Sequence, residues 1–190
     1  MSEGVSELAP VLMAVDPVPG TGKRIEAELT KRYGDDYEVA CPGTPDHAIG
    51  ILERFKQDGR QVAVILAAAL LPGMDGTDFL ARAHHLFPAA KRGLLIDWGD
   101  TSRSVPVRRA MARGHIDFFV QKPLGVREEN FHRTISELLE EWARSQGLGV
   151  EAVRVVGERW SRRSQEMRSL LERYGIPFTF LVADAPEGSR

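Results

Sequence analysis

Short apolar runs and amphipathic stretches alternate along most of the chain. Apolar runs of strand length lie at residues 10–16, 37–41, 61–67, 92–96 and 116–120. Amphipathic periodicity predicts helices over residues 20–33, 75–87, 104–113 and 127–146, and a further helix that begins at Pro45 and buries Ala48, Ile49, Leu52 and Phe55. The run at 61–67 is almost wholly apolar, as parallel strands buried on both faces require. Five strands alternating with five helices predict an α/β fold with a doubly wound five-stranded parallel sheet.

A glycine-containing break follows the last of these helices. Beyond it, the sequence predicts a strand over residues 153–157, a helix over 162–174 and a strand over 176–182, which together make one βαβ unit. The expected organisation is therefore a domain over residues 1–146, a linker over 147–152 and a small βαβ segment over 153–190.

In a doubly wound sheet, ligands bind where the strands end, so the residues that follow each strand are the candidates for a functional site. Asp16 follows the first strand, and Phe119 lies three residues before Lys122-Pro123 after the fifth. The third strand leads into the turn Pro72-Gly73-Met74-Asp75-Gly76. Over residues 10–146 this layout resembles the receiver domain of response regulators, and the resemblance implies a flavodoxin-like fold.

The resemblance also implies which positions would accept and hold a phosphoryl group, and most of them are changed. Asp16 matches the first acid of the Mg²⁺-binding pair, but the second falls on Pro17. The acceptor aspartate falls on Ala68, whose methyl group is neither a nucleophile nor a metal ligand. The hydroxyl position falls on Ile96, and Lys122 matches the phosphate-contacting lysine. We expect no metal site, and an Asp16–Lys122 ion pair in its place.

Three nearby residues bear on this pocket. Asp75 suits the N-cap of the third helix rather than the acceptor position. Asp97 follows Ile96 and is expected to be a surface turn residue, with a side chain that points into the vacated pocket as the alternative. Phe119 matches the receiver aromatic that moves inward on activation, and here it is expected to pack against Ile96.

A group of arginines lies on or near the fourth helix, with no acidic residue between Thr101 and Gly114. In receivers, the surface formed by the fourth helix, the fifth strand and the fifth helix is the usual partner surface. The sequence therefore indicates either a solvated basic face or a partner surface that includes Arg103, Arg108, Arg109 and Arg113.

The C-terminal segment resembles the first βαβ unit of a glutaredoxin. Ser161 and Ser164 keep the C-x-x-C spacing at the start of its helix but carry no thiols, so Ser161 is better interpreted as an N-cap. The order of the two segments resembles the N-terminal part of proteins in which a response-regulator module is fused to a thioredoxin-reductase-like flavoprotein. No G-x-G-x-x-G flavin motif is present, and we expect no cofactor.

Composition narrows the function classes. The net charge of −2 gives no general attraction to nucleic acid or membranes, and no helix-turn-helix follows the receiver-like region. The single cysteine, Cys41, excludes a disulfide within the chain and a cysteine-based zinc site. The first residues do not resemble a signal peptide, so a cytoplasmic location is expected.

These observations favour a non-enzymatic, phosphorylation-independent receiver-like signalling module that binds a protein. That partner would be a flavin disulfide reductase domain, or a second copy of the chain. One alternative is a small-molecule or anion sensor that uses the vacated pocket, with Lys122 and the loop at Gly20 as its cationic and backbone donors. Another is a conventional phosphorelay response regulator.

Overall fold

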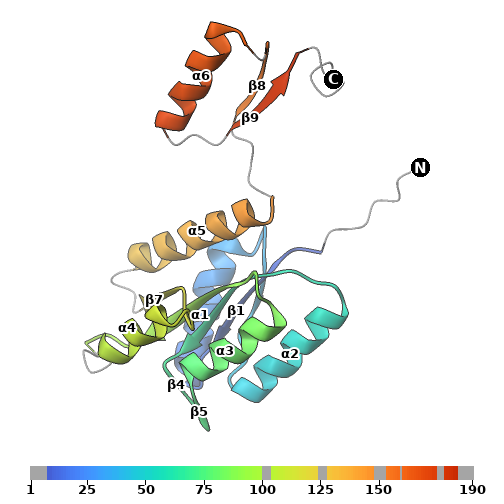
Figure 1. Cartoon of the computed structure of the whole chain (residues 1–190). Helices are drawn as coiled ribbons and strands as arrows, with labels where there is room; N and C mark the ends of the chain where they lie inside the picture. Colours follow the sequence, from blue (N-terminus) through green and yellow to red (C-terminus); the bar gives the residue numbers. More distant parts are fainter. Residues whose placement is uncertain are drawn as a thin grey trace. The chain divides into compact units, whose positions relative to one another are not determined.

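The computed structural model describes residues 8–99, 104–123, 128–147, 153–158, 160–174 and 178–183. The chain divides into two units, Met1–Ala143 and Arg144–Arg190 (Figure 1). Among the described helices, none combines the length and the apolar character needed to cross a lipid bilayer.

A five-stranded parallel sheet forms the centre of the first unit. Its strands are β1 (Val11–Val15), β2 (Glu38–Ala40), β3 (Val62–Ala68), β6 (Lys91–Ile96) and β7 (Phe118–Gln121). They lie in the order β2-β1-β3-β6-β7, so the chain moves outward from β1 first to one side and then to the other. This order confirms the predicted doubly wound, flavodoxin-like fold.

Helices cover both faces of the sheet (Figure 1). One hydrophobic cluster joins the sheet to α1 (Pro19–Tyr33) and α5 (Glu128–Ser145), and the other joins it to α2 (Pro45–Gln57), α3 (Gly76–Leu86) and α4 (Ser104–Ala112). All seven residues of β3 are buried, because this strand lies in the middle of the sheet with helices on both faces.

Two side-chain caps fix where helices begin on the α2 and α3 side. The Thr44 hydroxyl accepts a hydrogen bond from the His47 N–H, and Pro45 occupies the first turn of α2. The Asp75 carboxylate accepts bonds from the Thr77 N–H at 3.0 Å and the Thr77 hydroxyl at 2.9 Å. Asp75 is therefore the N-cap of α3, as predicted.

The segment between β3 and α3 is more ordered than the predicted loop and turn. Leu70–Leu71 (β4) and Met74–Asp75 (β5) form a short antiparallel hairpin. Its turn is Pro72-Gly73, and Gly73 has a φ of 77°, a conformation that glycine adopts without strain. The hairpin sets the path of the chain from the end of β3 into α3.

The second unit is the predicted βαβ. It consists of β8 (Val153–Gly157), α6 (Arg162–Arg173) and β9 (Phe178–Val182), and the two strands pair in parallel from Val153 opposite Phe178 to Gly157 opposite Val182. The predicted linker lies partly outside the described residues.

Gly76 provides a test of how closely α3 approaches the end of β3. A Cβ atom at Gly76 would lie 2.2 Å from the Ala68 carbonyl oxygen and 3.0 Å from Leu94 Cδ1. We expect Gly76→Ala to lower the free energy of unfolding by about 1–3 kcal/mol, because backbone must move to make room. Urea denaturation measures this change.

Gly50→Ala in α2 is the matched control, because nothing lies within 4 Å of a Cβ there. Alanine is the better helix former, so this change should raise stability by about 0.5–1 kcal/mol. Equal effects of the two substitutions would contradict the close packing of α3 on β3.

Candidate functional site

Four of the sequence-predicted site residues lie at the carboxyl ends of neighbouring strands. Asp16 follows β1, Ala68 ends β3, Ile96 ends β6, and Lys122 follows β7. Val15 pairs with Ala67, so Asp16 and Ala68 occupy the next step of the same register. The fold thus brings these positions to one edge of the sheet, where doubly wound proteins bind ligands.

At this edge of the sheet, the Lys122 ammonium group lies between the carboxylates of Asp16 and Asp97. Lys122 Nζ lies 2.9 Å from Asp16 Oδ2 and 3.0 Å from Asp97 Oδ1. The Asp16 side chain is 1% exposed and that of Lys122 is 8% exposed, whereas that of Asp97 is 71% exposed. Asp16 Oδ1 also accepts a hydrogen bond from the Val18 N–H at 2.9 Å. The Asp16–Lys122 contact is direct and buried.

The environment of Lys122 keeps its charge in place. Burial by itself lowers the pKa of the Lys122 ammonium, but hydrogen bonds to Asp16 and Asp97 and the negative charges of both carboxylates outweigh it. The net effect is a raised pKa, so Lys122 is charged throughout the neutral range.

The remaining receiver positions offer no phosphoryl or metal chemistry. Ala68 and Ile96 are buried aliphatic side chains, and Pro17 is half-buried. Within the part of the chain that the structure describes, no group of three or more His, Cys, Asp or Glu residues is placed to hold a metal. The residues present do not fit Mg²⁺, because Pro17 and Ala68 supply no carboxylate, and Asp16 and Asp97 already bind the Lys122 ammonium group.

Asp97 belongs to the site, although the sequence favoured a surface turn residue over one that points into the pocket. It is exposed, as expected of a turn residue, but its carboxylate is bound to Lys122 rather than free in solvent. The available signal was its position directly after the end of β6, at the same edge of the sheet as Lys122.

The expected inward packing of Phe119 on Ile96 is wrong. Phe119 is 49% exposed, and the register sets it beside Leu94, while Gln121 lies beside Ile96. β7 is the last strand of the sheet, so a side chain on its face has a neighbouring strand on one side only.

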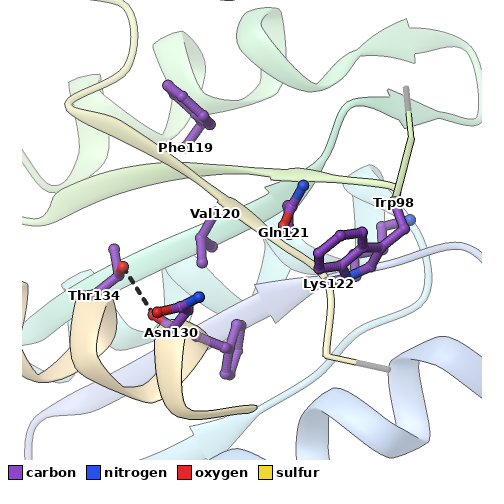
Figure 2. Close-up of a pocket in the computed structure, with 8 residues that line it drawn as sticks. Trp98, Phe119, Val120, Gln121, Lys122, Asn130 and Thr134 are labelled. Atoms are coloured by element: carbon purple, nitrogen blue, oxygen red, sulfur yellow. Dashed lines mark hydrogen bonds between the residues drawn. The ribbon is translucent and has the colours of Figure 1, made fainter. Parts of the chain in front are cut away.

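A hollow of about 180 Å³ runs along this edge strand. Its lining comes from the loop after β6, from β7 and from α5, and consists of Trp98, Phe119, Val120, Gln121, Lys122, Asn130, Phe131 and Thr134 (Figure 2). The Thr134 hydroxyl donates a hydrogen bond to the Asn130 carbonyl oxygen at 3.0 Å. Lys122 therefore connects the buried ion pair to an open surface with aromatic groups, which the sequence did not predict.

The predicted arginine surface is only partly described. Arg108 and Arg109 on α4 and Arg113 just after it are exposed, and Arg103 lies outside the described residues. The described arginines thus present a basic face beside the exposed edge strand β7.

Ser161 and Ser164, the two positions at which the sequence resembles the C-x-x-C spacing of glutaredoxins, lie at the start of α6. Ser161 directly precedes the helix, and its carbonyl oxygen accepts a hydrogen bond from the Gln165 N–H at 3.1 Å. Ser164 faces β8, since its hydroxyl oxygen lies 2.5 Å from where a Cβ of Gly157 would be. A bulkier residue than glycine at position 157 would displace Ser164.

No protein-family model matches the sequence, and a comparison with curated proteins gives no match. Solved structures are similar in fold. The signal receiver domain of an HD domain-containing protein from Pseudomonas fluorescens Pf-5 matches with a TM-score of 0.59 and 22% identity, over 77% of this chain and 98% of that one. A CheY-like receiver domain protein from Methanospirillum hungatei JF-1 matches with a TM-score of 0.56 and 21% identity, over 72% and 98%.

A third similar structure is an adenylate cyclase from Rhodopirellula baltica, with a TM-score of 0.60 and 16% identity, over 74% of this chain and 94% of that chain. At these identities the comparisons establish the fold. The first unit has the receiver fold of response regulators.

Introducing the missing acceptor carboxylate tests the electrostatics of the strand ends. Ala68→Asp places another buried carboxylate next to Asp16 in the register, with Lys122 already shared. We expect the free energy of unfolding to fall by about 1–3 kcal/mol. Asparagine has nearly the same shape as aspartate but no charge, so Ala68→Asn should lower the free energy of unfolding by less. A rise in melting temperature of Ala68→Asp without added metal would contradict the assignment of position 68 to this acidic edge.

Removing the Lys122 charge should lower the free energy of unfolding more than Ala68→Asp does. Lys122→Met leaves Asp16 buried without its cation, so we expect a loss of about 3–5 kcal/mol in the free energy of unfolding. Asp97→Asn, which removes only the exposed partner, should cost less than about 1 kcal/mol. Chemical denaturation of the three proteins at neutral pH measures both values.

The same pair predicts a specific pH dependence. Because the pKa of Lys122 is raised in the folded state, its stabilisation is complete below the ordinary lysine pKa of about 10.4 and is lost as pH rises through the folded value. The stability difference between wild type and Lys122→Met should therefore be constant from neutral pH to about pH 10 and shrink above it. A difference that disappears near neutral pH would show that the ion pair is not what stabilises this edge.

Proposed function

We propose that this chain is a signalling module of receiver fold that acts by binding a protein and does not accept a phosphoryl group. The observation that carries this proposal is Ala68, a buried methyl group at the end of β3 where the receiver acceptor would be. Without a carboxylate there, the chain has no nucleophile for a phosphoryl donor at this position.

The state of Lys122 supports a constitutive mode of action. A phosphate-contacting lysine must exchange its partners when a phosphoryl group arrives. Here Asp16 and Asp97 hold the ammonium at 2.9 and 3.0 Å. Ile96 has no hydroxyl to move toward a phosphoryl group, and Phe119 is already outside the core. The proposed module presents one binding surface whether or not a phosphoryl donor is present.

The proposed binding surface combines α4 and β7. Arg108, Arg109 and Arg113 supply positive charge, and Phe119 on β7 supplies an exposed aromatic side chain. Aromatic and arginine side chains are the residues most often responsible for binding energy in protein interfaces. Such a surface fits an acidic partner with an apolar contact.

The proposed partner is a flavin disulfide reductase domain, on the basis of the fused-flavoprotein resemblance described above. In this proposal the chain is a regulator and not the enzyme, since Ser161 and Ser164 have no thiols to exchange.

One observation favours a second candidate, a small-molecule sensor. The hollow beside Lys122 has aromatic and amide groups that could orient a small ligand, among them Trp98, Gln121 and Asn130. An anion would have to compete with Asp16 and Asp97 for Lys122, so this candidate favours a neutral ligand.

The protein-binding proposal is tested by combining intact mass with a binding titration. The chain is incubated with acetyl phosphate and Mg²⁺, and its affinity for a purified thioredoxin-reductase-like flavoprotein is measured before and after. We expect no phosphate adduct and an unchanged Kd. A base-labile adduct of one phosphate, or a Kd that changes about tenfold on treatment, would overturn phosphorylation independence.

Paired arginine variants test the surface in the same titration. Arg109→Glu reverses a charge on α4 and should weaken binding by roughly tenfold, the effect of about 1.4 kcal/mol. Arg82→Glu makes the same change on the exposed face of α3 and should leave the Kd unchanged. Absence of measurable binding by the wild-type chain would reject the flavoprotein partner, independently of the mass result.

A further inference from the structure

Exposed apolar side chains are concentrated in the small C-terminal unit. Val156, Trp160, Met167, Leu170 and Tyr174 are among the large hydrophobic residues exposed in the described part of the chain, and Trp160 is 82% exposed. A unit of this size with so many exposed apolar groups is typical of an incompletely covered interface.

The face of α6 that covers the strands is formed by other residues. Ser164 faces Gly157 of β8, the Arg168 guanidinium lies 5.2 Å from the centre of the Phe180 ring on β9, and Leu171 is buried. These residues recur at intervals of four and three, so they mark one side of the helix.

A second stripe runs along the flank of α6. Each helical residue is rotated by 100° from the one before, so Arg163, Met167, Leu170 and Tyr174 fall together about a quarter-turn from the inner face. With the right-handed crossover that such βαβ units almost always have, this flank lies on the side of β8 rather than β9. An exposed apolar stripe on the flank, rather than the outside, of a helix requires a neighbouring helix to bury it.

Within the described residues, β8 also has no strand on the edge that faces away from β9. In the described residues, β8 pairs only with β9, in a sheet of two strands, so its other edge presents unpaired backbone N–H and C=O groups. Two-stranded sheets are marginally stable by themselves, and open edges bind further strands. A single partner would therefore have to supply a strand beside β8 and a helix beside α6.

We propose that a second copy of this chain supplies both, through a two-fold axis perpendicular to the sheet. The axis pairs β8 with β8 of the other copy in antiparallel fashion and makes one four-stranded sheet. If α6 lies midway over strands about 4.8 Å apart, the two helices are then about 9.6 Å apart. Packed helices lie 8–10 Å apart. The same two-fold axis therefore pairs the open edge of β8 and packs the flank of α6 against the other copy.

The two-fold axis also places the stripe on α6 against the same stripe of the second copy, and the side chains of the two stripes match. An antiparallel pairing centred between Met167 and Leu170 places each of these side chains against the other type in the second copy. It also brings Arg163, at one end of the stripe, to Tyr174 at the other end. An arginine over a tyrosine ring is a favourable contact, so the polar end of each stripe matches the aromatic end of its partner.

Two methionine variants test this interface by analytical ultracentrifugation of the full chain over a range of concentrations. Met167 on α6 is 46% exposed and Met111 on α4 is 39% exposed, so substitution by glutamate is tolerated by folding at either position. We expect a wild-type dimer, a dimer weakened by at least roughly tenfold in Met167→Glu, and a change of less than about twofold in Met111→Glu.

A cross-linking arm tests the two-fold geometry. In a Cys41→Ser background, mixed Met167→Cys and Leu170→Cys chains should form a disulfide-linked heterodimer under mild oxidation. A monomeric wild-type chain would overturn the proposal and indicate that the stripe is covered by another part of the chain or by a different protein. A dimer lost in Met111→Glu but kept in Met167→Glu would also overturn it, because the interface would then lie on the first unit.

Discussion

The Lys122 ammonium group joins the ends of three strands. Asp16 follows β1, Asp97 follows β6 and Lys122 follows β7, and each of the two carboxylates lies within about 3 Å of the same nitrogen. Of these groups, only Asp97 is largely in solvent, so the Asp16–Lys122 contact forms in surroundings where an unpaired charge would be costly. The edge of the sheet at which receiver-fold proteins carry out their chemistry is thereby occupied by one ammonium group held between two carboxylates.

Several other features are consistent with this constraint. A third carboxylate at position 68 would add another negative charge beside the single Lys122 ammonium group, and the buried alanine there avoids this. Ile96 fills its position without a polar group that would need a partner. Phe119 is not part of the core. It lies on the edge strand β7 and lines the hollow beside Lys122. Under the proposed function, the strand ends are a fixed support for a binding surface.

The sequence was sufficient for the main elements because long apolar runs such as Val62–Ala68 and capped helices such as α2 have strong local signals. The β4–β5 hairpin was missed because two-residue strands are shorter than any detectable period. The Asp97 contact depends on how the loop after β6 directs its side chain toward β7, and the exposure of Phe119 depends on strand order. Neither is encoded in local spacing, whereas the loss of the acceptor at Ala68 could be seen directly.

Strand ends that form a single, preset state should not respond to a phosphoryl-like group. Beryllofluoride with Mg²⁺ imitates an acyl phosphate on a receiver aspartate, so a backbone amide NMR spectrum recorded with and without it tests this claim most directly. The account predicts that the signals of Val18, Ala68, Asp97, Phe119 and Lys122 do not move. Saturable shifts of Phe119 and Lys122 together on adding beryllofluoride would contradict it, because they would reveal a second state of the site that a phosphoryl-like group can select.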